Sequence, residues 1–293
     1  MKAAAAGQAA ALRARISGMV EALVADVPPW GRRLAAAGAL ILFVIVFASL
    51  AAPLLSPYSP VEPSGDPLEP PSLRHPLGTD RLGRDVYTRI LYGGRIVLWV
   101  ALLSSLMSAA VGVPLGLVSG YAGGRVDRAL SMVMDALYAF PGLILAIALA
   151  AVLGPRPENA AAAIAVVYIP TYFRMVRAVT LHVKASPFME ALEALGLPPG
   201  LILRRHVLPH VLPTVMVVFS LAAADAVLTE AALSFLGLAV KPPTPDWGFD
   251  LYNAKGYATT APWLVAAPGA AITLLALSLA LIGEGLSERV GWR

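Results

Sequence analysis

The sequence contains no cysteine and little charge, and both absences limit what the protein can be. Without Cys there is no disulfide scaffold, no thiol nucleophile and no thiolate metal ligand. Asp, Glu, Lys and Arg make up 14% of the 293 residues and hydrophobic residues 58%, whereas a soluble domain carries about 25% charged residues. The mean hydropathy is +0.73. A soluble enzyme and a disordered chain are therefore excluded, and an integral membrane protein of several helices is predicted.

Motifs for the common catalytic chemistries are also missing. The chain has no G-x-x-x-x-G-K-S/T phosphate-binding loop, so it cannot hydrolyse ATP by that route, and it has no G-x-S-x-G or H-E-x-x-H motif. Three His residues surround one loop, but no carboxylate has a matching spacing; they are His182, His206 and His210. We therefore expect no catalytic residue, no cofactor and no metal site in this chain. The net charge of +4 requires no nucleic-acid partner, because it suits loops that face anionic lipid.

Long runs of uncharged residues predict six membrane-spanning helices in an all-α, polytopic fold. A span needs about 20 mostly apolar residues, and the gaps between charged residues provide six candidates. They lie at residues 34–55, 96–119, 129–153, 159–178, 207–238 and 262–283. The core of a signal peptide has only about 7–15 apolar residues near the chain start. Since the first run here is longer and begins at residue 34, we expect an uncleaved first helix.

The distribution of Lys and Arg predicts that both termini face the cytoplasm. With the N-terminus inside, 14 of these residues fall on the inner side and 8 on the outer side, which accounts for all 22. The chain then divides into a cytoplasmic segment 1–33, a first helix 34–55, an outer segment 56–95, a core 96–286 with five spans and an inner loop 184–209, and a tail 287–293.

The outer segment has two parts with different patterns. Residues 56–71 are rich in Pro, which lacks a backbone donor and favours an extended chain. From residue 75 to 95, apolar residues recur at helical spacing between charged ones, namely Leu82, Val86, Ile90 and Leu91. This spacing predicts a short amphipathic helix at the outer surface of the membrane.

The inner loop combines signals for the start and the end of a helix. Ser186 suits an N-cap and is followed by Pro, which predicts a short helix over 187–195. Gly196 and residues 198–200 then end this helix, and Gly196 suits a positive φ or a close approach. A second helix begins near Leu201 and continues into the fifth span. These residues alone leave two interpretations, an amphipathic connector or an element that docks into a partner protein.

The same loop resembles the EAA loop of ABC importer permeases. The residues that carry the resemblance are Glu190, Ala191, Gly196, Leu208 and Pro209. Leu192 and His206 stand where this family often has Ala and Ile. The resemblance implies a cytoplasmic coupling helix between spans four and five, docked on an ATP-binding subunit.

Further segments resemble the C-type permease subunits of dipeptide, oligopeptide and nickel importers. They lie at residues 75–93, 125–147, 230–248 and 261–286. The resemblance implies a non-catalytic subunit in the inner membrane of a bacterium or archaeon. It also implies four kinds of partner: membrane lipid, a homologous second permease, two ATP-binding subunits that carry ATP and Mg, and an extracytoplasmic solute-binding protein. The solute would be a dipeptide, an oligopeptide or a related solute such as nickel.

Acidic residues in the predicted spans are candidates for the translocation path. A carboxylate inside a membrane is costly, so it usually faces a cavity or a partner. The candidates are Asp225, Asp135 and Glu230, and the same argument applies to Glu284. Such residues could line a polar path that favours a cationic or zwitterionic solute, or each could be satisfied by a hydrogen bond between helices. Asp225 falls mid-span, and the resemblance does not explain it.

One alternative from another class stays open at this point, an ion-gradient-driven secondary transporter. Its intramembrane acids would bind protons or cations. The sequence shows no inverted repeat and no matching pair of Gly- or Pro-broken spans. Dependence of uptake on ATP or on a proton gradient would separate the two classes.

Overall fold

The computed structural model describes residues 28–290, and every regular element in this range is a helix. Five helices are long and apolar enough to cross a membrane: α2 (Pro29–Leu50), α4 (Val86–Ala122), α7 (Pro157–Lys184), the continuous run of α9 (Pro199–Ile202) and α10 (Leu208–Phe235), and α12 (Trp263–Val290). A bent pair, α5 (Gly124–Tyr138) and α6 (Gly142–Leu153), counts as a sixth candidate. The predicted all-helical class is confirmed, and for the six predicted spans the structure provides five candidates, or six if the bent pair counts as one. The predicted tails fall largely outside the described residues.

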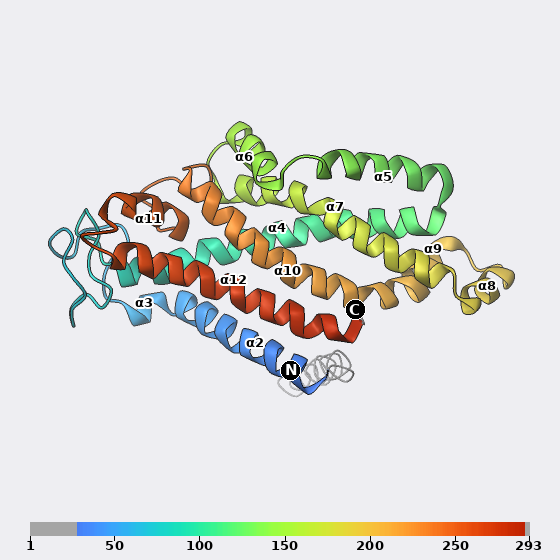
Figure 1. The fold of residues 1–293 in the computed structure, drawn as a ribbon, viewed down its shortest axis with the longest axis horizontal. Coiled ribbons are helices and arrows are strands. Elements are labelled where there is room, and N and C mark those ends of the chain that lie inside the picture. The colour runs from blue at the N-terminus through green and yellow to red at the C-terminus, as the bar shows by residue number, and fades with distance from the viewer. Residues whose placement is uncertain (1–27, 291–293) are drawn as a thin grey trace, which may run out of the picture.

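The long helices lie side by side along the long axis of the molecule (Figure 1). One end holds residues 56–85 and the short helix α11 (Trp247–Ala254), which together we call the collar. The opposite end holds α8 (Pro187–Ala194) and α9, and we call it the α8 end. Helix α2 begins and α12 ends on the side of the bundle toward α8 (Figure 1), so the described chain starts and finishes on the same side.

Three glycines bring α4 and α7 into close contact. Gly112, Gly116 and Gly120 recur every four residues, so they lie on one face of α4. A Cβ atom on Gly116 would lie 2.7 Å from the carbonyl oxygen of Phe173, and one on Gly120 would lie 2.7 Å from Cβ of Thr180. Small residues at this spacing let helix backbones approach in a membrane, where apolar burial gives no advantage over lipid. Van der Waals contact along this stripe therefore holds the central helix pair together.

The third predicted span is not one straight helix, which corrects the prediction of a span over 129–153. Helix α5 ends at Tyr138, α6 starts at Gly142, and their axes differ by 85°. The reason is Pro141, which is the N-cap of α6 and has no N–H to continue α5. A Pro also disfavours helical backbone at the residue before it, here Phe140. Helix α6 has 12 residues, about 18 Å of length, so it cannot cross the hydrocarbon layer of about 30 Å on its own.

The amphipathic helix predicted over residues 75–95 is wrong in its first half. Residues 56–85 contain turns and one isolated bridge between Thr79 and Asp85, and the helix begins only at Val86 as the first turn of α4. Asp85 sets this start, because its side chain accepts hydrogen bonds from the N–H and the hydroxyl of Thr88 at 2.7 and 2.6 Å. Gly78 and Gly83 both have positive φ, which is incompatible with a helix upstream of the cap.

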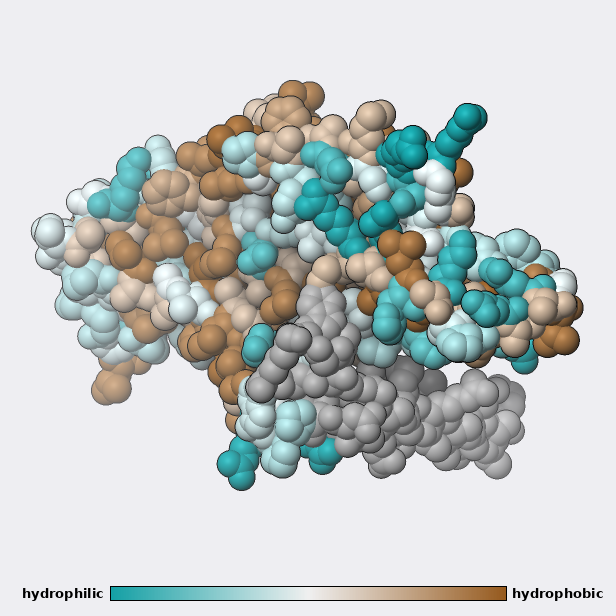
Figure 2. Space-filling view, turned by 45° about the vertical axis from the view of Figure 1, so that its right-hand side comes forward, coloured by the Kyte–Doolittle hydropathy of each residue, from teal (hydrophilic) through white to brown (hydrophobic). Residues whose placement is uncertain are grey.

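Exposed apolar side chains surround the middle of the bundle, as a membrane protein requires. Figure 2 shows hydrophobic side chains over much of its middle and hydrophilic ones gathered toward the α8 end. Helix α2 is the clearest case, since Leu40, Phe43 and Phe47 are each more than half exposed. A soluble protein rarely leaves so continuous an apolar surface uncovered.

Candidate functional site

A cleft of about 550 Å³ opens where the bent pair α5–α6 faces α7 and α10. Its wall is mostly apolar, with four residues that carry polar groups. These are Tyr138, Tyr168, Thr171 and Asp225. The bend at Pro141 produces the cleft, because it places Tyr138 and Phe140 on the wall beside Gly142 of α6. A mainly apolar cavity with a few polar groups is typical of a small-molecule site.

Asp225 lies on the cleft wall with its side chain exposed in this single chain. Among the described residues that line the cleft, it alone carries a charge, and no hydrogen bond or ion pair of its carboxylate occurs within residues 28–290. Its backbone is fixed by Thr229, whose hydroxyl donates to the Asp225 carbonyl at 2.9 Å and lies 3.3 Å from the hydroxyl of Tyr168. The cleft wall therefore carries one carboxyl group, and its backbone is held in place by Thr229.

Asp135 lies at the edge of this region and has a partner. Its Oδ1 accepts a hydrogen bond from Nη2 of Arg174 at 2.7 Å, and the Arg174 guanidinium lies 4.0 Å from the ring centre of Tyr138. Both charged side chains are largely exposed. This contact joins α5 to α7 beside the cleft, and Asp135 is not on the lining itself.

The other two acidic candidates lie elsewhere. Glu230 is fully buried where α10 packs on α11, outside the lining of the cleft. Glu284 is exposed in the last turns of α12. Of the four acids chosen by charge alone, the structure thus brings Asp225 to the cleft.

Helix α8 projects from the bundle with one buried anchor. Met189 is 1% exposed and packs in a cluster with Val183 of α7, Ile202 of α9 and Val207, which directly precedes α10. Glu190 and Ala191, the next residues, are exposed. The segment is also tied to α4, because Nζ of Lys184 donates to the carbonyl oxygen of Tyr121 at 2.6 Å and the Tyr121 hydroxyl lies 3.3 Å from Glu193. A fixed helix thus presents an exposed acidic face.

Gly196 ends α8 with the positive φ that the sequence predicts. Its φ is +72°, its N–H donates to the carbonyl of Glu193 at 2.9 Å, and the Leu197 N–H reaches the carbonyl of Leu192 at 3.4 Å. This pair of bonds is the Schellman motif, which favours Gly. Apart from Gly196 itself and its two neighbours in sequence, no atom of the described chain lies within 4 Å of the position a Cβ would take, so the surface at Gly196 is open. The predicted N-cap Ser186 is at the right position, but its hydroxyl donates back to Val183 instead of capping.

The second inner helix starts at Pro199 and becomes wider before it enters the long span. Residues Leu203–Val207 form a π-helical turn directly before Leu208 and Pro209. Pro209 has no N–H to donate to the carbonyl four residues earlier, which explains a local change of hydrogen bonding there. Leu208 is half-buried and Pro209 is exposed. His210 stacks on Phe188, and its Nδ1 lies 2.7 Å from the His206 carbonyl.

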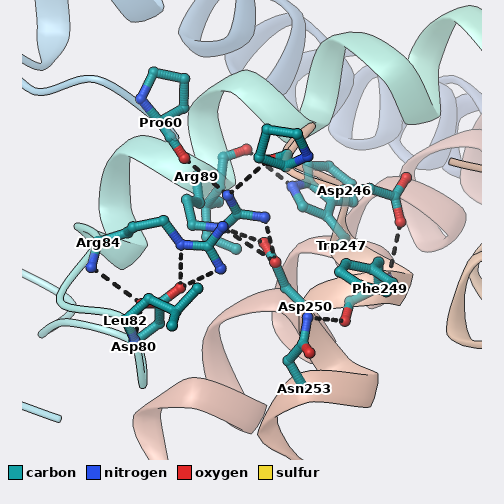
Figure 3. A network of polar contacts seen from close by, with 12 residues as sticks. Pro60, Asp80, Leu82, Arg84, Arg89, Asp246, Trp247, Phe249, Asp250 and Asn253 are labelled. Atoms are coloured by element: carbon teal, nitrogen blue, oxygen red, sulfur yellow. Dashed lines mark hydrogen bonds and ion pairs between the residues drawn. The ribbon is translucent and has the colours of Figure 1, made fainter. Parts of the chain in front are cut away.

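Polar contacts in the collar bind three segments together (Figure 3). The buried guanidinium of Arg89 donates to both oxygens of Asp250, at 2.6 to 3.1 Å, and to the carbonyl of Pro60 at 2.8 Å. Arg84 pairs with Asp80 at 2.6 Å. Burial, partly offset by the Arg89 charge, raises the pKa of Asp250 from 3.8 to about 6.

Some residues of the cleft carry no charge and were missed by a search for acids. Tyr138, Tyr168 and Thr171 belong to apolar helices and look like ordinary core residues in the sequence. The available signal was Phe140-Pro141-Gly142, because this sequence breaks a helix inside a predicted span.

Comparisons with known proteins agree on one family. The model of the family described as binding-protein-dependent transport system inner membrane component matches residues 112–292. The dipeptide transport system permease protein DppC of Alkalihalophilus pseudofirmus is 39% identical over 258 residues, which cover 87% of this chain and 84% of that protein. The glutathione transport system permease protein GsiD of Pectobacterium atrosepticum is 40% identical over 220 residues, which cover 75% and 73%.

A solved structure shares the fold at lower similarity. A chain of the MetNI methionine ABC transporter in an inward-facing conformation superposes with a TM-score of 0.59 and 19% identity, covering 70% of this chain and 97% of that chain. At this identity the likeness concerns the fold alone.

Proposed function

Because the chain belongs to the family of binding-protein-dependent transport system inner membrane components, we propose that it is the peptide-conducting half of an ABC importer's membrane path. As a member, it is a multi-pass permease subunit of the inner membrane and is not itself an enzyme. The family also excludes the alternative of a gradient-driven secondary transporter. The cleft beside Asp225 is the observation that carries the proposal for this chain.

The proposed solute is a short peptide. The relatives are named for transport of dipeptides, of di- and tripeptides, and of glutathione, all of which combine amide bonds with amino and carboxylate groups. The cleft supplies matching groups, namely one carboxylate for an amino group and the hydroxyls of Tyr138, Tyr168 and Thr171 for peptide carbonyls. An unpaired carboxylate in a span is costly, and a passing ammonium group would lower that cost. Nickel would lack the several ligands it needs here.

A second permease would complete the path. At the rim of the cleft, Phe140 is 59% exposed, and Ile144 in the first turn of α6 is 61% exposed. In the assembled importer, the homologous subunit would cover this rim and leave the polar wall facing a shared passage. The six spans of this chain would then form one half of the translocation path.

The α8 segment is the proposed contact with one of the two ATP-binding subunits, which would hold ATP and Mg. Met189 anchors the helix, so Glu190 and Ala191 face outward, and Gly196 leaves an open surface directly behind them. Leu208 and Pro209 lie at the start of the span that lines the cleft. A shift of α8 would therefore act on α10 through the π-helical turn.

The proposed orientation has the α8 end in the cytoplasm and the collar outside. Loop 184–209 and the chain segments 1–33 and 287–293 would be cytoplasmic, and the core 96–286 would hold five spans. The excess of Lys and Arg on that side supports this. The collar, with the Pro-rich residues 56–71, would face the solute-binding protein.

The test is transport by the complex that this chain forms. Gentle extraction from native membranes with mass spectrometry should recover ATP-binding subunits and a second permease. Reconstituted with the binding protein, this complex should take up a labelled dipeptide only with ATP. Asp225→Asn should reduce uptake, while Glu284→Gln, an equivalent change outside the cleft, should not. Recovery of the chain alone, or equal uptake by both variants, would contradict the proposal.

A further inference from the structure

Two carboxyl groups are enclosed together where α10 packs on α11. Glu230 and Asp246 are both 0% exposed, and the Ser234 hydroxyl, one turn after Glu230 on α10, donates to Asp246, which places the two carboxyl groups side by side. Three of their four oxygens, both of Glu230 and Oδ2 of Asp246, have no hydrogen-bond donor in the described chain. Two adjacent acceptors attract each other only if one of them carries a hydrogen.

Packing around the pair leaves little room for the helices to separate. The Trp247 side chain is 1% exposed, and its Nε1 donates to the carbonyl of Ile90 at 2.9 Å. Gly248 lies so close to the backbone of Ala231 that a Cβ atom would not fit. Because α11 is pressed on α10 and α4 in this way, solvent does not hydrate the two carboxyl groups.

Within residues 28–290, no positively charged side chain forms an ion pair with either carboxyl group. The cations nearby already have partners in the described chain: Arg89 binds Asp250, and Arg84 binds Asp80. Asp250, one turn further along α11, adds a further acidic group near Asp246. A metal ion would be poorly coordinated here, since no group of three or more His, Asp or Glu side chains within residues 28–290 could hold one. Two adjacent buried carboxylates cannot both stay ionised at a reasonable cost.

We propose that Glu230 and Asp246 form a buried proton-binding site, in which the Glu230 carboxylic acid donates a hydrogen bond to Oδ2 of Asp246. The surroundings decide which group holds the proton. Asp246 is the N-cap of α11 and accepts from the Phe249 N–H at 2.9 Å and from the Ser234 hydroxyl, and both donors favour its ionised form. Glu230 receives no hydrogen bond from the part of the chain that the structure describes. One hydrogen then converts a repulsive contact into an attractive one.

The site joins the span that lines the cleft to the helix of the collar. Loss of the proton would place two negative charges in contact and drive α11 away from α10. This role is separate from solute transport by the cleft, because neither group lies on its lining.

Infrared spectroscopy of the purified complex tests the proposal. The difference spectrum of wild type minus Glu230→Gln at neutral pH should show the C=O stretch of a protonated carboxylic acid. Glu230→Gln should keep the apparent Tm near that of wild type, because its amide still donates to Asp246. Glu230→Ala, which removes the donor, should lower it.

Each of three results would overturn the proposal. The first is the absence of the carboxylic acid band from the difference spectrum. The second is a Glu230→Gln variant that fails to assemble or is as unstable as Glu230→Ala. The third is a rise in Tm on adding Na⁺ or Ca²⁺ that wild type shows and Glu230→Gln does not, because a metal ion would then occupy the site.

Discussion

At the scale of single residues, Arg89 organises the collar. It lies in the first turn of α4, yet it reaches the carbonyls of Pro60 and Pro243 as well as the carboxylate of Asp250. The backbone of the Pro-rich segment has few donors of its own, so a buried guanidinium with five N–H groups is well suited to hold it. Removal of either member of the Arg89–Asp250 pair would leave an uncompensated buried charge.

The titration of Asp250 gives the first prediction. Its pKa is about 6 in the folded chain and 3.8 as a free side chain, so the folded state binds the additional proton between these values. The resulting stabilisation is complete below about pH 3.8 and is lost as the pH rises through about 6. Lowering the pH from 7.5 to 5 should raise the apparent Tm of wild type more than that of Asp250→Asn. Equal responses of the two proteins would show that Asp250 keeps an ordinary pKa.

Gly196 gives the second prediction, and the chain offers a matched control. Gly237 ends α10 with the same Schellman bonds, a φ of +76° and open space around it, but at the collar end. An Asp at either position meets a similar backbone cost of about 1–3 kcal/mol. Gly196→Asp should reduce ATP-driven uptake about tenfold or more, equivalent to about 1.4 kcal/mol of lost docking energy. Gly237→Asp should reach the membrane equally well and retain uptake. Equal losses in both would mean that only the fold was affected.

At the scale of elements, the glycine stripe of α4 sets the distance between α4 and α7. Gly116→Val would place side-chain atoms against the backbone of Phe173 and should destabilise the chain by about 1–3 kcal/mol. Val118→Leu, on the exposed side of the same helix, should change stability by no more than about 0.5 kcal/mol. Thermal unfolding in detergent measures both. A Gly116→Val protein as stable as wild type would show that the helices can move apart without cost.

The helices were predictable where one physical signal decides them. Apolar runs locate the five long helices, and the Ser-Pro start and Gly196 stop place α8 to within one residue. The helix ends are less well predicted. Helix α4 begins at Val86, whereas the span was predicted to begin at residue 96. An uncharged run locates the apolar part of a helix, but the start of α4 is set by the N-cap at Asp85, which lies upstream of that run. Ser186 shows the same limit, since a residue can occupy a cap position without forming its hydrogen bond.

The candidate site was less predictable than the helices. Charge singles out four intramembrane acids, but only the three-dimensional arrangement places Asp225 on a cleft and Glu230 in a sealed contact. The two residues differ in the face of α10 on which they lie, toward α7 or toward α11. A helix that is buried on most sides has no single apolar face, so its hydrophobic pattern does not show which face packs on which neighbour. The 85° bend likewise depends on how α6 packs, although Pro141 indicates where it occurs.

At the scale of the whole molecule, the lack of cysteine allows the orientation to be measured directly. Single cysteines introduced as Leu73→Cys in the collar and Leu195→Cys after α8 would be the only thiols, and both positions are highly exposed. A membrane-impermeant maleimide should label the first in intact spheroplasts and the second only after the membrane is opened. The reverse pattern, or labelling of both from one side, would contradict the proposed orientation.

Helix α4 also has a mechanical consequence. Its 37 residues extend for about 56 Å, well beyond a hydrocarbon layer of about 30 Å. Arg89 fixes one end to the collar, while the Tyr121 carbonyl at the other end holds Lys184 beside α8. One continuous helix thus joins the collar to the α8 end of the bundle. In the proposed orientation, a movement imposed on the α8 end by ATP-binding subunits would reach the collar along this one helix, without a relay of side chains through the middle of the bundle.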